Sequence, residues 1–267
     1  MVTGATKNLG TRTTLLIGVL LETGALVAAS FATQLWHLYL TQGLLFGWGS
    51  SFLYIGTIGI IPQWFHQQRG IANGVAAAGS GIGGLIYSLA SDAIITKLGV
   101  AWSFRITAAC AAVVNIICTV LIRDRNKEIV PNQNGFEFGL LKRRSLHVII
   151  AWAAFSILGY TIVLFSLPNN GESVGLNSHQ GSTLGALANL GMAIGRPAMG
   201  FLSDRYGRVK VVSLATFLAA IFCFGLWIPG TGYSVLLAFS VLGGTVIGTS
   251  WAVCNYYFNK DGNAARG

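Results

Sequence analysis

The sequence predicts an all-α polytopic membrane protein. Of its 267 residues, 53% are hydrophobic and only 9% are charged, whereas a soluble domain carries roughly 25% charged residues. The apolar residues form eight continuous runs, each close to the ~20 residues that a helix needs to cross a bilayer. Outer-membrane strands alternate in polarity over ~10 residues, so continuous runs of this length predict helices.

The expected spans follow one another with mostly short connections. They cover 13–33, 36–61, 71–92, 102–122, 147–167, 181–203, 209–228 and 233–258. The one long connection contains Pro131, several asparagines and mixed charge, which predicts a flexible linker. The expected domains are therefore an N-terminal bundle of four spans (1–122), a cytoplasmic linker (123–146) and a C-terminal bundle of four spans (147–267).

The basic residues predict the orientation in the membrane. Fourteen of the 17 Lys and Arg residues fall at the chain ends or in every second loop; the others are Lys97, Arg105 and Arg196. Basic loops stay in the cytoplasm, so both ends of this chain and the linker are expected there. The net charge of +9 then reflects membrane topology, and no nucleic-acid partner is expected.

Two ionisable residues lie inside expected spans, where charge is costly and marks a pathway by default. Arg196 lies ~10 Å of helix before the nearest cytoplasmic turn, and its guanidinium can grip a carboxylate with two hydrogen bonds. The alternatives are snorkelling to the surface or a structural ion pair. Glu22, the one carboxylate well within a span, is either an ion relay or a cavity-facing or interfacial residue.

Two further polar side chains are candidates for the substrate site. Asn189 precedes Arg196 by two helical turns and so shares its face; it either binds substrate or supports another helix. Tyr160 either lines the cavity or belongs to the aromatic belt at the membrane surface.

Catalytic and metal sites are not indicated. The four histidines fall at span or loop ends without metal-ligand spacing, the four cysteines lie within apolar runs, and neither a nucleophile elbow nor a phosphate loop is present. We therefore expect neither an enzyme nor a cofactor or metal, and an ATP-driven pump is disfavoured.

A repeated loop pattern links the two expected bundles. The stretch from Gly4 to Arg12 aligns with that from Gly200 to Arg208, and an apolar span follows each. The first copy is degenerate, with no clear counterpart of Asp204. The copies mark equivalent points in two halves, as in transporters built from repeats.

The second copy resembles the loop motif of the major facilitator superfamily, Gly-x-Leu-x-Asp-Arg-x-Gly-Arg. That motif follows the second helix of each six-helix half, so the resemblance implies an incomplete two-bundle fold with helices three to ten of twelve. It also implies a conformational latch, in which the aspartate meets the positive end of a neighbouring helix and the arginines pair across the bundle. The latch residues would be Gly200, Asp204, Arg205, Gly207 and Arg208; the alternative is that this basic loop sets topology alone.

Two stretches resemble monocarboxylate porters, and the fungal branch fits best. Residues 63–84 are similar to the fifth-helix signature, and residues 189–200 to the eighth helix with its carboxylate-binding arginine, here Arg196. In the animal transporters an aspartate precedes that arginine by one turn. Because Met192 stands there, the resemblance carries over no Asp–Arg pair and proton coupling does not follow from these residues.

The fifth-helix stretch is rich in small residues, which allow helices to approach closely. The helix-packing residues expected here are Gly70, Asn73, Gly74, Gly79 and Gly83. A gating role during transport is the alternative.

The resemblance implies a secondary active transporter of monocarboxylates or related small organic anions. It would act in the plasma membrane by alternating access, with protons as the driving ion. The alternatives are efflux of an organic acid or secondary metabolite, and a non-transporting truncated or sensor membrane protein.

Overall fold

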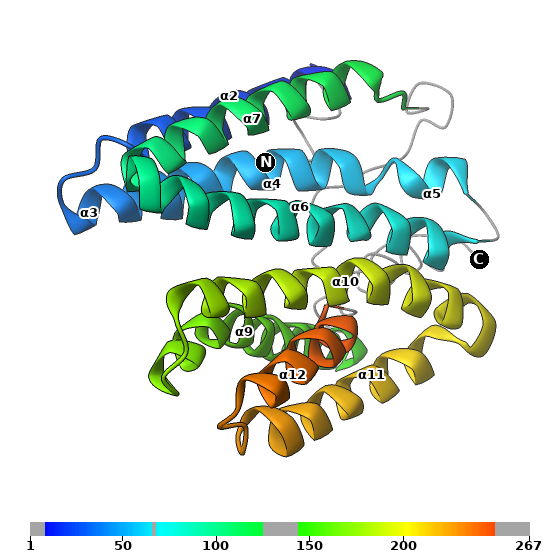
Figure 1. Cartoon of the computed structure of the whole chain (residues 1–267). Helices are drawn as coiled ribbons and strands as arrows, with labels where there is room; N and C mark the ends of the chain where they lie inside the picture. The colour runs from blue at the N-terminus through cyan, green and yellow to red at the C-terminus, as the bar shows by residue number, and fades with distance from the viewer. Residues whose placement is uncertain (1–8, 66–67, 125–143, 249–267) are drawn as a thin grey trace. The chain divides into compact units, whose positions relative to one another are not determined.

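The computed structural model describes residues 9–65, 68–124 and 144–248, and every regular element in these ranges is helical (Figure 1). The elements are α2 (Thr11–Ala29), α3 (Leu35–Leu38), η1 (Tyr39–Leu45), α4 (Phe46–Ile58), α5 (Ile61–Trp64), α6 (Arg69–Leu98), α7 (Val100–Leu121), α9 (Arg144–Ser173), α10 (Ser178–Tyr206), α11 (Arg208–Phe222), η3 (Cys223–Trp227) and α12 (Tyr233–Ile247). Because α3, η1 and α4 are continuous, as are α11 and η3, the eight expected spans correspond to eight helical rods in the described part of the chain.

Most of these rods have the length and the surface of membrane-spanning helices. Five stretches are long and apolar enough to cross a bilayer: Thr11–Ala29, Arg69–Leu98, Val100–Leu121, Ile150–Ser173 and Arg208–Trp227. Large apolar side chains point outward from them, with Leu20, Phe155 and Phe224 each about three-quarters exposed (74%, 76% and 74%). An apolar outer surface matches lipid as the solvent, so the chain is an integral, multi-pass membrane protein.

By contacts the chain groups into two compact units. Unit 1 is Met1–Trp64 with Ala93–Phe138, and unit 2 is Phe65–Asp92 with Gly139–Gly267. Most of α6 was expected in the N-terminal bundle, yet its contacts group it with the C-terminal helices because its glycines pack on α10. The division into two four-span bundles stays a prediction, and most of the expected linker (125–143) lies outside the described residues.

Unit 1 is built around α2, which packs against η1, α4 and α7. Glycines bring α2 and α4 into contact: a Cβ added at Gly49 would lie 2.6 Å from the Glu22 nitrogen, and one at Gly56 would lie 2.8 Å from Leu15. Such close backbone approach is how small residues replace the hydrophobic effect inside a membrane.

Polar side chains also hold the end of α7 in unit 1. The Arg12 guanidinium donates to the carbonyl oxygens of Val120 (3.4 Å) and Ile122 (3.3 Å), and the Trp64 indole donates to that of Arg123 (3.2 Å). Carbonyl groups at a helix end have no partner within the helix, and a cation there is favourable. The start of the expected linker is therefore fixed to α2 and α5.

Unit 2 has a small core between α9, α10 and α12. Its buried members are Leu167, Leu184, Ala188, Leu236 and Phe239. The Trp227 and Phe239 rings stack on one another with centroids 5.6 Å apart. This core fixes α10, the helix that carries Arg196, against its neighbours.

Within unit 2, α6 and α10 touch backbone to backbone. A Cβ added at Gly70, Gly74 or Gly81 would collide with α10, in the case of Gly81 at 2.6 Å from the Ala193 nitrogen. The expected packing role of Gly70 and Gly74 is therefore present. Pro197 lies inside α10 at this contact and, lacking an N–H, frees one helix carbonyl.

Two of the expected packing glycines are corrected. A Cβ at Gly79 or Gly83 would meet nothing within 4 Å, whereas Gly81 and Gly84 face α10. The spacing of four seen in the sequence picks a stripe on the wrong side of the helix, because an α-helix turns by 3.6 residues and the true contact runs through 70, 74, 81 and 84.

This contact gives a prediction with a matched control. Gly81→Ala should destabilise the protein by about 1–3 kcal/mol, the usual cost of forcing atoms into a packed interface. Gly79→Ala should instead stabilise it by about 0.5–1 kcal/mol, because Gly is a poor helix former and open space surrounds that position. Thermal unfolding of the two variants in detergent checks both signs, and equal effects would contradict the packing described here.

Candidate functional site

Arg196 is buried in unit 2, with only 4% of its surface exposed. Its Nη1 donates to the Ala77 carbonyl oxygen at 2.7 Å and to the Ser80 hydroxyl, both on α6. Its Nε donates to the Gly248 carbonyl oxygen, 3.3 Å away at the end of α12. The fourth acceptor is the Met192 sulfur, which lies 3.8 Å from Nη2 on the same helix.

These acceptors place the guanidinium at the meeting point of α6, α10 and α12. All four acceptors are electrically neutral. The Ser80 hydroxyl donates to the Ala77 carbonyl at 3.0 Å, which leaves its lone pairs for Arg196. Snorkelling was one alternative for Arg196, but in this structure its head is enclosed by protein groups.

The other two candidates for substrate binding lie near Arg196 without a described bond to it. Asn189 donates to the Gly185 carbonyl at 3.0 Å, and a Cβ at Gly84 would meet its amide group. The structure thus places it in the α6–α10 contact. Tyr160 and Met192 both line a small hollow of about 10 Å³, so Tyr160 reaches the thioether that contacts Arg196.

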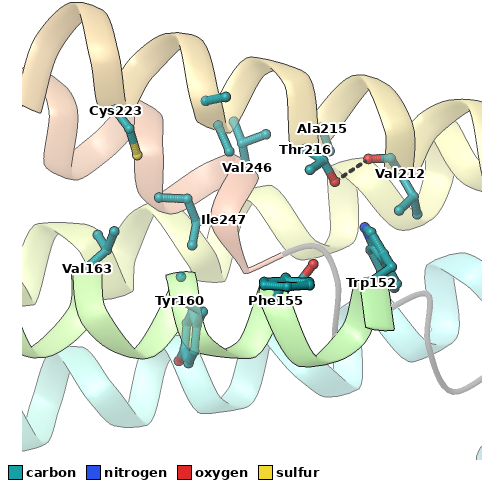
Figure 2. Close-up of a pocket in the computed structure, with 14 residues that line it drawn as sticks. Trp152, Phe155, Tyr160, Val163, Val212, Ala215, Thr216, Cys223, Val246 and Ile247 are labelled. Carbon is teal, nitrogen blue, oxygen red and sulfur yellow. Dashed lines mark hydrogen bonds between the residues drawn. The ribbon is translucent and has the colours of Figure 1, made fainter. Parts of the chain in front are cut away.

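The larger cavity on this side of unit 2 is apolar. A cavity of about 270 Å³ lies between α9, α11 and α12, and its walls include Trp152, Phe155, Tyr160, Thr216 and Val246 (Figure 2). In Figure 2 the Tyr160 ring points away from Thr216, whose hydroxyl donates to the Val212 carbonyl at 2.9 Å. Arg196 is not among its lining residues, so this cavity lacks the cation that would select an anion.

Asp204 caps the beginning of α6. Its Oδ1 accepts from the Gly70 amide and its Oδ2 from the Ile71 amide, each at 3.0 Å. Arg208 lies one turn further on, with Nη2 at 3.6 Å from Asp204 Oδ1. A carboxylate at a helix N-terminus satisfies free N–H groups and complements the helix dipole.

Two glycines make this cap possible. A Cβ at Gly200 would collide with the Gly70 backbone, so a larger residue would push α10 away from α6 and lift Asp204 off its amides. Gly207 has φ +92° and joins α10 to α11 as a single residue; other residues rarely adopt this backbone conformation. Arg205 lies 5.8 Å over the Tyr206 ring, and its pairing across a bundle stays a prediction.

Glu22 and Asn73, the remaining candidates, are both away from these contacts. Glu22 belongs to unit 1, where it accepts a hydrogen bond from Asn115. Asn73 is 5% exposed, and among the described residues its Oδ1 has no hydrogen-bond partner. Ser80 was not among the sequence candidates, although it shares the α6 face of Asn73 two turns away, and that periodicity was the available signal.

The comparisons with known proteins agree on one family. The model of the Major Facilitator Superfamily matches residues 2–168 and 149–260. "Probable transporter MCH2" of Saccharomyces cerevisiae is 33% identical over 240 residues, covering 88% of this chain and 51% of that protein. "Uncharacterized transporter ESBP6" of the same yeast is 31% identical over 262 residues, covering 94% of this chain and 39% of that protein.

Filamentous fungi contain similar proteins. An "MFS-type transporter" of Gibberella moniliformis is 30% identical over 251 residues, covering 93% of this chain and 60% of that protein. The chain thus spans about half the length of the curated relatives it matches. With the family model covering most of the chain and its fold built of bilayer-length helices, the chain belongs to the Major Facilitator Superfamily.

Proposed function

We propose that the chain serves in a secondary active transporter of monocarboxylates or related small organic anions, which works by alternating access and is driven by protons. The observation that carries this proposal is Arg196, a cation buried inside a membrane protein and held by neutral groups of three helices. An ionisable group at this depth is expensive and marks a substrate path. The relatives are named as transporters.

The chemistry of the guanidinium favours a carboxylate as the cargo. Hydrogen bonds between two ionised partners are roughly twice as strong as those between neutral ones, and the guanidinium fork fits both carboxylate oxygens. A substrate carboxylate would therefore be a better partner for Arg196 than the carbonyl, hydroxyl and thioether that it would replace. The same geometry favours no particular group on the rest of the substrate.

Substrate binding would compete with a contact between helices. Arg196 is too enclosed to meet an anion without giving up acceptors, and two of these, Ala77 and Ser80, belong to α6. An anion that takes their place would remove polar bonds from the α6–α10 contact. A ligand shifts a conformational equilibrium only by binding one state better than the other, and this exchange of partners supplies such a difference.

The cap at the start of α6 supports the latch role of the loop around Asp204. A charge at a helix end contributes about 0.3–1 kcal/mol when exposed and up to ~2 kcal/mol when partly buried. A contact of this size can hold one conformation without trapping it. Arg208 steadies the carboxylate, and Gly200 and Gly207 allow the approach.

The basic loops support a cytoplasmic position for both ends of the chain and for the linker. The latch then lies on the cytoplasmic side, and we propose the plasma membrane as the site of action. The partners are the organic anion, the proton and the lipid bilayer.

Arg196→Ala should lower the affinity for pyruvate about 10- to 100-fold, because a charge-assisted hydrogen bond contributes about 1.5–3 kcal/mol. The measurement is binding of labelled pyruvate, and of a panel of other carboxylates, to purified protein. Arg144→Ala, which removes an exposed cation at the start of α9, is the matched control and should bind normally. Unchanged binding of every carboxylate by Arg196→Ala would contradict the anion site.

Ser80→Ala tests the competition between the anion and α6. Removing an acceptor that holds Arg196 should raise the apparent affinity for the anion up to about fivefold, the equivalent of a hydrogen bond of ~1 kcal/mol. Ser240→Ala removes a buried hydroxyl that donates within α12, to the Leu236 carbonyl, and should leave the affinity unchanged. Weaker binding by Ser80→Ala would mean that the hydroxyl contacts the substrate instead.

Asp204→Ala tests the cap of α6. The amides of Gly70 and Ile71 lose their acceptor, so their hydrogen exchange should become about tenfold faster or more, since a bond to a charged group contributes about 1.5–3 kcal/mol. Mass spectrometry of peptides covering 68–75 measures this. Arg205→Ala should leave these amides unchanged because its guanidinium lies over Tyr206; equal exchange in both variants would rule out the latch.

A further inference from the structure

Three polar contacts join α2 and α7 in unit 1, one near each end and one in the middle. At one end Arg12 donates to the carbonyl groups that end α7. Near the other end Arg105 donates to the Ser30 hydroxyl at 3.2 Å, with its guanidinium 4.8 Å from the Phe31 ring. Between them Asn115 Nδ2 donates to Glu22 Oε2 at 2.9 Å.

The middle contact differs from the other two because its charge-bearing member is an acid. Glu22 lies eleven residues into α2 (Thr11–Ala29), which places its carboxyl group in the interior of the bilayer. Its backbone is fixed by α4, since a Cβ at Gly49 would lie 2.6 Å from its nitrogen and 3.0 Å from its Cα. The carboxyl group is thus held by two helices and cannot swing far toward water.

The other ionisable groups around Glu22 are distant or turned outward. Arg12 and Arg105 lie ten residues from Glu22 and Asn115 respectively, about 15 Å along the helix, and both are engaged at the ends. The remaining titratable groups on α2, η1, α4 and α7 are Tyr39 and Tyr54, which are 70% and 42% exposed, and the exposed thiols of Cys110 and Cys118. Asn115 is the polar contact of Glu22 among the described residues.

An amide is a suitable partner for an acid that changes its protonation state. The Asn115 amide nitrogen donates to an ionised carboxylate, and its oxygen accepts from a protonated carboxyl group. An arginine or lysine partner would hold the carboxylate ionised, whereas a neutral amide accommodates both states. An uncompensated charge inside a bilayer costs several kcal/mol, so proton binding would change the stability of this helix contact.

The other described carboxylates are poorly placed for this role. Asp124, Glu172 and Asp204 lie at or within a few residues of helix ends, and Asp92 lies six residues before the end of α6. Met192 occupies the position one turn before Arg196 and is itself in contact with the guanidinium. A proton that drives transport therefore needs an acid elsewhere in the membrane.

We propose that the Glu22 carboxyl group, hydrogen-bonded to Asn115 between α2 and α7, is the proton-binding site of the transport cycle. A proton from water adds to the carboxylate to give the neutral acid, and the same proton returns to water on the other side. No other bond is made or broken. This inference rests on the proposed proton-driven transport, while the proton site itself belongs to unit 1 and the anion site to unit 2.

The first experiment reads the proton directly and needs no substrate. Infrared difference spectra of the reconstituted protein between acidic and alkaline buffer should show the C=O band of a protonated carboxyl group. In Glu22→Gln this band should be lost, and in Asn115→Leu it should shift because its hydrogen bond is gone. An unchanged band in Glu22→Gln, or no band in the wild type, would overturn the proton site.

The second experiment separates proton coupling from transport itself. Glu22→Gln keeps an oxygen that accepts from Asn115 but binds no proton. In liposomes it should lose accumulation of pyruvate against a gradient when the outside is acidic, yet exchange labelled for unlabelled pyruvate at equal pH like the wild type. Arg196→Ala should lose both activities, so failure of the anion site gives a different pattern.

Two other outcomes would also overturn the inference. Glu22→Gln that accumulates pyruvate normally would show that the proton binds elsewhere. A variant that loses both activities while its thermal unfolding matches the wild type would mean that Glu22 acts in transport generally rather than in proton coupling.

Discussion

The close approach of α6 and α10 is the constraint on which the rest of the candidate site depends. Because Gly70, Gly74 and Gly81 carry no Cβ, the two backbones touch, and the polar groups of α10 reach the backbone of α6. Asp204 then reaches amide groups at the start of that helix, and Arg196 reaches a carbonyl further along it. Inside a membrane such contacts are the main source of helix association.

This arrangement joins two interactions of opposite sign on the same pair of helices. A carboxylate of α10 binds the amino end of α6, while a guanidinium of α10 binds its carbonyl and hydroxyl groups. Each is a modest contact in water and a stronger one at low dielectric. Together they make α6 sensitive to any ion that competes at Arg196 and to any movement of the loop after α10.

Much of the fold could be predicted from the sequence, because a membrane imposes a simple rule on helix length and loop charge. The eight helical rods and the special role of Gly207 follow from apolar runs and from one loop motif. The stripe of α6 that packs could not be read correctly from spacing alone. Gly79 and Gly81 lie on different faces of one helix, and only the neighbour decides which of them is needed.

The candidate site shows the same division. Arg196 and Asp204 stand out in the sequence because charged residues are rare in apolar runs. Ser80 does not, since a serine among glycines and alanines is ordinary until a guanidinium lies against it. The contact between Asn115 and Glu22 links residues 93 positions apart, and without homologous sequences no local pattern reports such a pair.

The anchoring of the end of α7 has a mechanical consequence. Helix ends fray first because their last carbonyl groups lack partners, and a connecting segment under tension would unwind α7 from that end. Here side chains from α2 and α5 hold the carbonyl groups of residues 120, 122 and 123. A pull on the chain beyond residue 124 is therefore shared among three helices, and the last turn of α7 can bear load that it could not bear alone.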